Sequence, residues 1–155
     1  MNSAHIHLAL SHLPIFGVLI GLIILAYGQF SKKDLLSITG LIFFVATALI
    51  AIPVFLTGED AGKIIKNLPG ASDSLIEAHE ELAEKAIWLI GALGALSVVA
   101  LYFYLKARSK FRLSCVIIIV LALVTMGLMI NVGNSGGQIR HTEIRTSDIQ
   151  AEPEN

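Results

Sequence analysis

The sequence predicts an all-α integral membrane protein, a four-helix bundle whose helices run up, down, up and down across a bilayer. Two observations predict this fold class. The chain is too apolar for an ordinary soluble domain, with 55% hydrophobic and 15% charged residues and a mean hydropathy of +0.76. Apolar stretches about as long as a bilayer is thick also recur along the chain, with short connections between most of them.

Each of these stretches approaches the ~20 residues that a helix needs to cross the hydrocarbon. Because hydrocarbon offers no hydrogen-bonding partner to the backbone, we expect each stretch to be helical, and short connections make neighbouring helices antiparallel. The predicted spans are residues 8–27, 35–56, 82–105 and 113–132, in one domain of residues 1–145. Ser72 or Asp73 is expected to cap a helix that runs into the third span. The polar residues 146–155 are expected to form a disordered tail.

Basic residues predict the orientation of the bundle. The first connection contains Lys32 and Lys33, and the third contains four more: Lys106, Arg108, Lys110 and Arg112. The positive-inside rule places both connections in the cytoplasm, and both termini then lie on the periplasmic side of a bacterial inner membrane. No lysine or arginine precedes the first span, so we expect it to remain as a helix and not to be removed as a signal peptide.

Several function classes find no support in the sequence. A formal net charge of -1 provides no basic surface for nucleic acid. The single cysteine, Cys115, lies in an apolar run, which excludes a disulfide framework and a cysteine-based zinc site. We find no phosphate-binding glycine loop, nucleophile elbow or internal repeat. Gly17 and Gly21 form a G-x-x-x-G pair, which predicts one close helix approach.

The histidines are expected to gather at the non-cytoplasmic face. Three lie in or just before the first span, one opens the third span and one follows the fourth: His5, His7, His12, His79 and His141. His12 lies about one turn inside its span, where an imidazole is costly without a partner. Intramembrane ionisable residues are therefore candidates for function.

Pro14 is expected to disturb the first span close to these histidines. Its ring removes a backbone donor and frees the carbonyl of Leu10, which can bend the helix or accept a hydrogen bond. In an unbroken helix His7 and His12 would be about 140° apart and could not ligate one ion together, whereas His5 and His12 would share a face.

Small residues accompany two of the other histidines. Ala83 and Ala86 follow His79 at i+4 and i+7, and they leave the flat space that a porphyrin ring needs. Gly136-Gly137 precede His141 by about a turn, and they permit a close approach of backbone to a ligand or end the helix.

Four motifs along the chain occur together in one family. They are His7-Leu-Ala-Leu-Ser-His12-Leu-Pro14-Ile15, Thr57-Gly58-Glu59-Asp60, His79 at the start of the third span, and Gly136-Gly137-Gln-Ile-Arg-His141. On these residues the chain resembles the domain-of-unknown-function 2231 family of small bacterial membrane proteins, whose first element reads H-x-x-x-x-H-F-P-I; Leu13 here replaces the aromatic residue. The resemblance covers nearly the whole folded chain. It implies a four-helix module that is similar to b-type cytochromes, is found beside cytochrome c-like domains and holds haem through His7, His12, His79 and His141.

A b-type haem needs paired neutral imidazoles from facing helices, apolar walls and groups that bind its propionates. The expected bundle offers one bis-histidine pair, or two pairs if two haems stack at the same face. The candidate propionate partners are Arg140, Arg145 and Lys63. Bis-histidine ligation leaves no open coordination position, which favours electron transfer over oxygen chemistry. We therefore expect an electron carrier more than a stand-alone enzyme, with quinol or a c-type cytochrome as partner and a homo-oligomer as one possible state.

Two other functions remain open from the sequence. One is a non-haem copper, zinc or iron site built from histidines and carboxylates: His12, His79 and His141 with Glu59, Asp60 or Glu80. The chain lacks the H-E-x-x-H or E-x-x-H pair that would strengthen this alternative. The other is a structural subunit of a respiratory complex, which predicts a colourless, metal-free protein.

Overall fold

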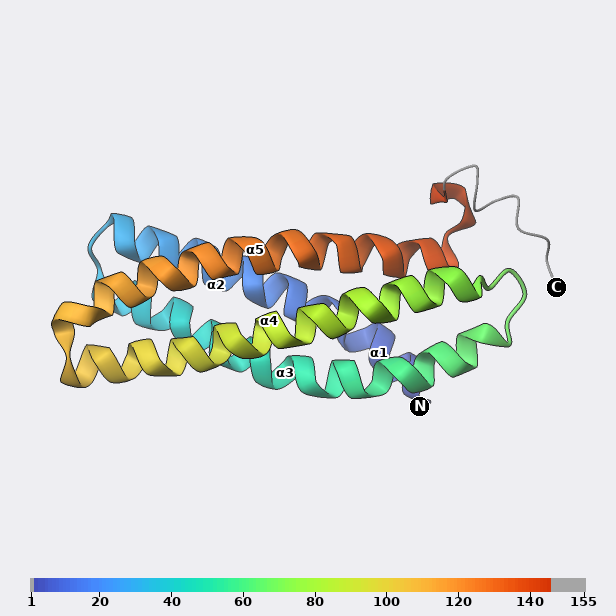
Figure 1. Cartoon of the computed structure of the whole chain (residues 1–155), viewed down its shortest axis with the longest axis horizontal. Coiled ribbons are helices and arrows are strands. Elements are labelled where there is room, and N and C mark those ends of the chain that lie inside the picture. Colours follow the sequence, from blue (N-terminus) through green and yellow to red (C-terminus); the bar gives the residue numbers. More distant parts are fainter. Residues whose placement is uncertain (1, 146–155) are drawn as a thin grey trace.

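Long helices run side by side along the whole length of the protein in the computed structural model, which describes residues 2–145 (Figure 1). The elements are α1 (Ser3–Leu10), α2 (His12–Phe30), α3 (Asp34–Lys66), α4 (Asp73–Lys106), α5 (Arg108–Arg140) and a short 3-10 helix, η1 (Thr142–Ile144). No strand occurs between residues 2 and 145. The prediction of an all-α fold with four long helical segments is confirmed, and the predicted disordered tail lies outside the described residues.

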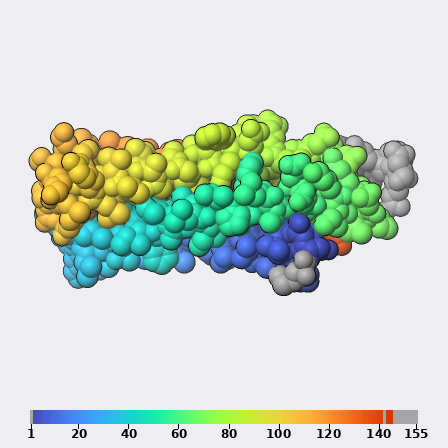
Figure 2. All heavy atoms as spheres, turned by 90° about the horizontal axis from the view of Figure 1, so that it is seen from below, coloured from blue at the N-terminus to red at the C-terminus, as the bar shows by residue number. Residues whose placement is uncertain are grey.

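The helices pack in a closed antiparallel ring. α2 packs on α3, α3 on α4, α4 on α5 and α5 on α2, while α1 lies against α3. Figure 2 shows α3 running between α4 and the N-terminal helices on one face of the molecule. The α2–α3 and α4–α5 turns lie at one end of the bundle. The N-terminus, the α3–α4 connection and the end of α5 lie at the other end (Figure 1), which we call the histidine end because His5, His7, His79 and His141 belong to it.

Within the described part of the chain, residues 2–145, four helical segments are long and apolar enough to cross a membrane: Ser3–Phe30, Asp34–Lys66, Asp73–Lys106 and Arg108–Arg140. Each is longer than the predicted apolar span because polar residues at the histidine end are helical as well. Ser72 caps α4 by accepting a hydrogen bond from the backbone N–H of Leu75 at 3.5 Å, as predicted. α3 likewise continues past Thr57 to Lys66, a stretch that the sequence assigned to a connection.

The first helical segment breaks where Pro14 predicts a disturbance. α1 ends at Leu10, α2 begins at His12, and Ser11 forms a turn between them. Pro14 has no N–H to donate to the carbonyl of Leu10, four residues earlier, so the regular helical ladder is interrupted there. Ser11 itself keeps helical backbone angles (φ -57°, ψ -29°), and its N–H donates to the carbonyl of His7, so the interruption is local and His7 and His12 keep a helical spacing.

Glycines allow α2 and α3 to approach closely, as the G-x-x-x-G pair predicts. Gly17 lies against Thr47, and a Cβ at Gly21 would stand 2.7 Å from the ring of Phe44. Farther along the same interface, a Cβ at Gly28 would stand 2.6 Å from the backbone nitrogen of Ser37. A side chain at these positions would therefore force the two helices apart.

The apolar core is divided into two clusters. The main cluster runs along the bundle and includes Phe44, Leu93 and Ile118. A smaller cluster closes the histidine end and consists of Leu75, Ile76 and Ile139. The space between these clusters contains the candidate site.

Candidate functional site

A cavity of about 740 Å³ lies inside the histidine end of the bundle. Ala86, Ile90 and Met129 of the main cluster line it, and so do Ile76 and Ile139 of the end cluster. Helices α1 to α5 all contribute to its wall. Its volume falls within the range of roughly 300–1,000 Å³ that is typical of cofactor and ligand sites.

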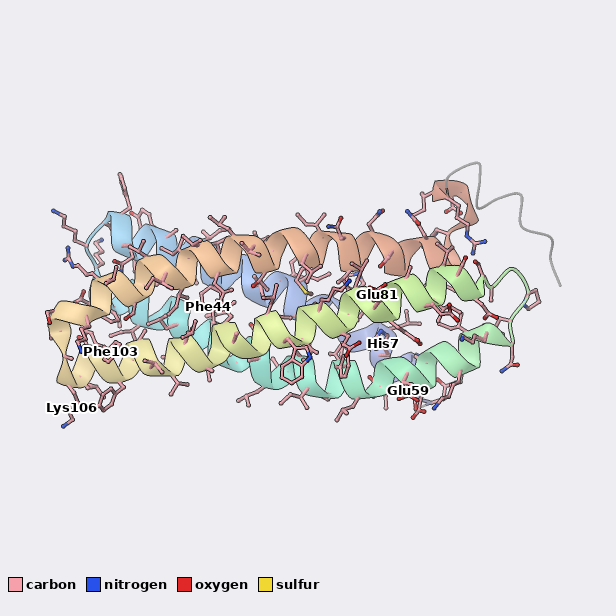
Figure 3. All side chains as sticks on the ribbon, in the orientation of Figure 1. His7, Phe44, Glu59, Glu81, Phe103 and Lys106 are labelled. Atoms are coloured by element: carbon pink, nitrogen blue, oxygen red, sulfur yellow. The ribbon has the colours of Figure 1, made fainter. Side chains whose placement is uncertain are left out.

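The cavity brings together the four histidines that the family resemblance identifies. His7 comes from α1, His12 from α2, His79 from α4 and His141 from the residue after α5. Figure 3 places His7 at the same level along the bundle as Glu81 of α4. His5 does not line this cavity and borders a neighbouring groove instead.

His7 is held by the facing helix α3. Its Nδ1 lies 3.0 Å from the carbonyl oxygen of Val54. A carbonyl oxygen can only accept a hydrogen bond, so Nδ1 must carry the proton and Nε2 keeps its lone pair. Gly58 makes room for the ring, since a Cβ there would stand 3.3 Å from its Cε1 atom. The α3 backbone thus fixes both the position and the tautomer of this imidazole.

His79 is held in a similar way by α5. Its Nδ1 lies 2.9 Å from the hydroxyl oxygen of Ser135, and that hydroxyl donates to the carbonyl of Val132 at 3.0 Å. When the hydroxyl gives its single proton to Val132, the Nδ1 of His79 is the donor in the other hydrogen bond. Gly136 lies behind the ring, where a Cβ would stand 3.1 Å from Cε1.

The other two cavity histidines are exposed and have local partners. The Nδ1 of His12 lies 3.3 Å from the hydroxyl of the adjacent Ser11, which donates to the carbonyl of Leu8 at 3.2 Å. The Nδ1 of His141 lies 2.8 Å from a carboxylate oxygen of Glu143. The backbone N–H of Glu143 and the His141 ring lower the pKa of this carboxyl, which favours its ionised, accepting form. We therefore assign the ring proton to Nδ1 in both His12 and His141.

The wall around the histidines is largely apolar. Ala83 and Ala86 border the cavity beside His79, as their spacing predicts. Further apolar side chains come from α2, α3 and α4: Pro14, Ile15, Ala51, Val54 and Ile87. An apolar wall with a few convergent polar groups is the usual construction of a cofactor pocket.

Charged side chains border the cavity as well, and most are acidic. The carboxylates are Glu59, Glu77, Glu80, Glu81 and Glu84. Arg140 is the basic residue among the lining side chains, apart from the histidines. Of the other two predicted propionate partners, Lys63 pairs with Glu59 at 2.8 Å, and Arg145 donates to backbone carbonyls. Arg140 is therefore the best placed of the three.

The ligands considered for a non-haem metal site are not assembled in the structure. Within residues 2–145, no three histidine, cysteine, aspartate or glutamate side chains form a group that could hold a metal ion. The side chain of Glu80 instead packs over Gly62 of α3, where a Cβ would stand 2.6 Å from Oε1.

Comparison of the chain with protein-family models, curated proteins and solved structures finds no match in any of the three. The chemistry of the cavity must therefore carry the functional argument. The class that the structure defines is an all-helical bundle with four helices of membrane-spanning length and a histidine-lined cavity at one end. The sequence did not single out Ser135, Val54 or Val132, which orient two of the rings. The one signal in the sequence is a hydroxyl residue directly before a glycine, as in Thr57-Gly58 and Ser135-Gly136.

Proposed function

We propose that the chain is a multi-pass protein of a bacterial inner membrane that binds b-type haem in its cavity and carries electrons. The four apolar helices support the membrane location. The lysines and arginines of the α2–α3 and α4–α5 ends support an orientation with those turns in the cytoplasm and the histidine end in the periplasm.

The observation that carries the haem proposal is the state of the four imidazoles. Each has its Nδ1 engaged by an acceptor, which leaves Nε2 as the nitrogen that can donate a lone pair to iron. Metal-bound histidines almost always donate their other ring N–H to a carbonyl, a carboxylate or a similar acceptor. His5, which lies outside the cavity, has no side-chain hydrogen bond of this kind among the described residues.

We assign His7 and His79 as the axial pair. Both rings are half-buried, whereas His12 and His141 are exposed. They come from α1 and α4, are anchored by α3 and α5, and line the same cavity. Two rings held by different helices of the bundle suit an iron bound between them. His12 and His141 are hydrogen-bonded only to near neighbours in the chain among residues 2–145, so their rings are held less firmly.

The other residues that line the cavity fit the porphyrin ring and the propionates of haem. The apolar wall of α2, α3 and α4 suits the faces of a porphyrin. The glycines behind the two rings permit close packing, and Arg140 supplies the positive charge for a propionate. Bound haem would supply one-electron transfer, and a filled pair of axial positions would exclude oxygen chemistry.

The acidic border of the cavity supports a basic redox partner. Glu77, Glu80 and Glu84 are exposed at the histidine end and have no ion pair among residues 2–145. Charge complementarity of this kind steers the encounter of electron-transfer proteins. A c-type cytochrome with a basic face fits this surface, with quinol from the bilayer as the alternative donor.

The test is an absorption spectrum of the detergent-purified protein, oxidised and then reduced, with pyridine haemochrome and metal analysis on the same sample. We expect a sharp Soret band, with α and β bands on reduction, from a low-spin bis-histidine haem. His7→Gln and His79→Gln should each abolish the low-spin spectrum, while His5→Gln should retain it. A protein that stays colourless after haem is supplied in excess would overturn the haem proposal. Stoichiometric zinc, copper or non-haem iron would favour the metal-site alternative, and a metal-free protein the structural subunit.

A further inference from the structure

The two halves of the bundle hold their central histidines with the same short segment. α3 contains Val54-Phe-Leu-Thr57-Gly58, and α5 contains Val132-Gly-Asn-Ser135-Gly136. In each segment the hydroxyl oxygen lies within hydrogen-bond distance of the valine carbonyl three residues earlier, at 3.1 Å for Thr57 and 3.0 Å for Ser135. In each, the glycine that follows faces an imidazole from another helix. The correspondence is limited to these short segments and is marked by their shared contacts.

The two segments differ in the atom that the histidine reaches. His7 bonds directly to the backbone carbonyl of Val54, and Thr57 only shares that acceptor and also donates to Pro53 at 2.8 Å. His79 bonds to the side chain of Ser135, which passes the hydrogen bond on to its own helix. Substitution of the hydroxyl residue therefore removes the side-chain acceptor of His79 and leaves only the Val132 carbonyl within reach of that ring, whereas the carbonyl that His7 uses is unaffected.

We propose that Ser135 is the positioning residue of His79: its hydroxyl holds the ring as the Nδ1–H tautomer, with Nε2 available beside that of His7. The consequence for iron binding rests on the proposed function, whereas the tautomer is a property of the chain itself. Loss of a partner that orients a metal-bound histidine typically costs about 10–100-fold in metal affinity. We expect a loss of haem affinity of about this size when the Ser135 hydroxyl is removed.

The experiment measures the tautomer in the full-length protein before haem is added. Histidines labelled with 15N are recorded in detergent at pH about 8, where an imidazole with a pKa near 6.5 is neutral, and the His79 signals are assigned with His79→Gln. The wild-type spectrum should show His79 with its proton on Nδ1. Ser135→Ala should show a mixture of the two tautomers, and Ser135→Thr, which keeps the hydroxyl, should restore the wild-type signals.

Thr57→Val is the matched control, since it removes the equivalent hydroxyl from the α3 segment. We expect the His7 signals to remain those of a single Nδ1–H tautomer because the Val54 carbonyl is unaffected. Haem titration and the redox potential of the same variants give the second readout. Ser135→Ala should lower haem affinity about 10–100-fold, and Thr57→Val should leave it within a few-fold of wild type.

Two outcomes would overturn this role of Ser135. One is an unchanged His79 tautomer in Ser135→Ala, which would mean that the α5 backbone alone orients the ring. The other is an equal effect of Ser135→Ala and Thr57→Val, which would indicate a general loosening of the site. A protein that binds no haem but shows the predicted NMR signals would overturn the proposed function and leave the tautomer assignment intact, so the two failures can be told apart.

Discussion

Gly136 of α5 and His79 of α4 are in direct contact: a Cβ added to the glycine would stand 3.1 Å from Cε1 and 3.4 Å from Nδ1 of the imidazole. Nothing larger than glycine fits behind the ring unless the ring moves by a few tenths of an ångström. The ring is tied to Ser135 on the same helix, so a displacement would strain that hydrogen bond. This relationship makes the glycine part of the site.

Gly136→Ala is therefore expected to weaken haem binding about tenfold, the effect of roughly 1.4 kcal/mol within the usual range for overpacking. The matched control is Gly127→Ala on the same helix, because nothing lies within 4 Å of a Cβ at that position. Haem titration of both variants, with circular dichroism to verify the helices, makes the comparison. Equal affinities in the two variants would show that the space behind His79 is not restrictive.

One haem per chain is the expected stoichiometry, since among the histidines of residues 2–145 only His7 and His79 are hydrogen-bonded to a second long helix within that range. His12→Gln and His141→Gln should each retain the low-spin spectrum and the haem-to-protein ratio of wild type. Pyridine haemochrome analysis against protein concentration measures that ratio. A value of two that falls to one in either variant would instead assign these two histidines to a second haem.

The close α2–α3 interface provides a prediction for stability. A Cβ at Gly40 would stand 2.7 Å from the backbone nitrogen of Leu25, and one at Gly28 would stand 2.6 Å from that of Ser37. Backbone atoms cannot move aside as the end of a side chain can, so Gly28→Ala and Gly40→Ala should each lower the free energy of unfolding in detergent by about 2 kcal/mol. Gly91→Ala is the control, because a Cβ there meets no atom within 4 Å. Similar stability in all three variants would contradict the tight contact.

Much of this fold could be predicted because long apolar runs restrict the choices. An apolar run of bilayer length has to be a helix, and short connections allow only antiparallel neighbours. The break before Pro14 and the cap at Ser72 follow equally from local chemistry. The extension of α3 to Lys66 was missed because that stretch is polar and the hydropathy pattern ends before it. Its acidic and basic side chains pair along the helix, as Glu59 does with Lys63 at 2.8 Å.

The gathering of the candidate histidines was predictable from the sequence, and the contacts that hold their rings were not. Clustering of histidines at one end follows from topology, and the structure brings four of them to one cavity. Which rings are anchored depends on contacts between residues far apart in the chain, such as His7 with Val54 and His79 with Ser135. Single-sequence patterns contain no information on such pairs. The likeness of the α3 and α5 segments becomes visible only once the histidine that each one contacts is known.

Arg145 and Arg140, both propionate partners predicted from the sequence, are expected to have different roles. The guanidinium of Arg145 donates to the carbonyls of Gln138 at 2.8 Å, Ile139 at 2.9 Å and Gly70 at 2.9 Å, so it ties the end of α5 to the α3–α4 connection. Hydrogen bonds from a charged group are worth roughly 1.5–3 kcal/mol. Arg145→Ala should therefore raise amide hydrogen exchange around Gly70 about tenfold or more.

Arg140→Ala is the informative counterpart, since Arg140 lines the cavity and its side chain has no hydrogen bond or ion pair among residues 2–145. It should leave exchange around Gly70 unchanged and lower the haem redox potential, because removal of a positive charge beside the iron favours the oxidised form. Lys66→Ala makes the same change of net charge at the same end of the bundle and controls for long-range electrostatics. If Arg145→Ala shifts the potential as much as Arg140→Ala without affecting exchange, Arg145 contacts the haem directly, and its hydrogen bonds to the three carbonyls are not what holds this end of the bundle together.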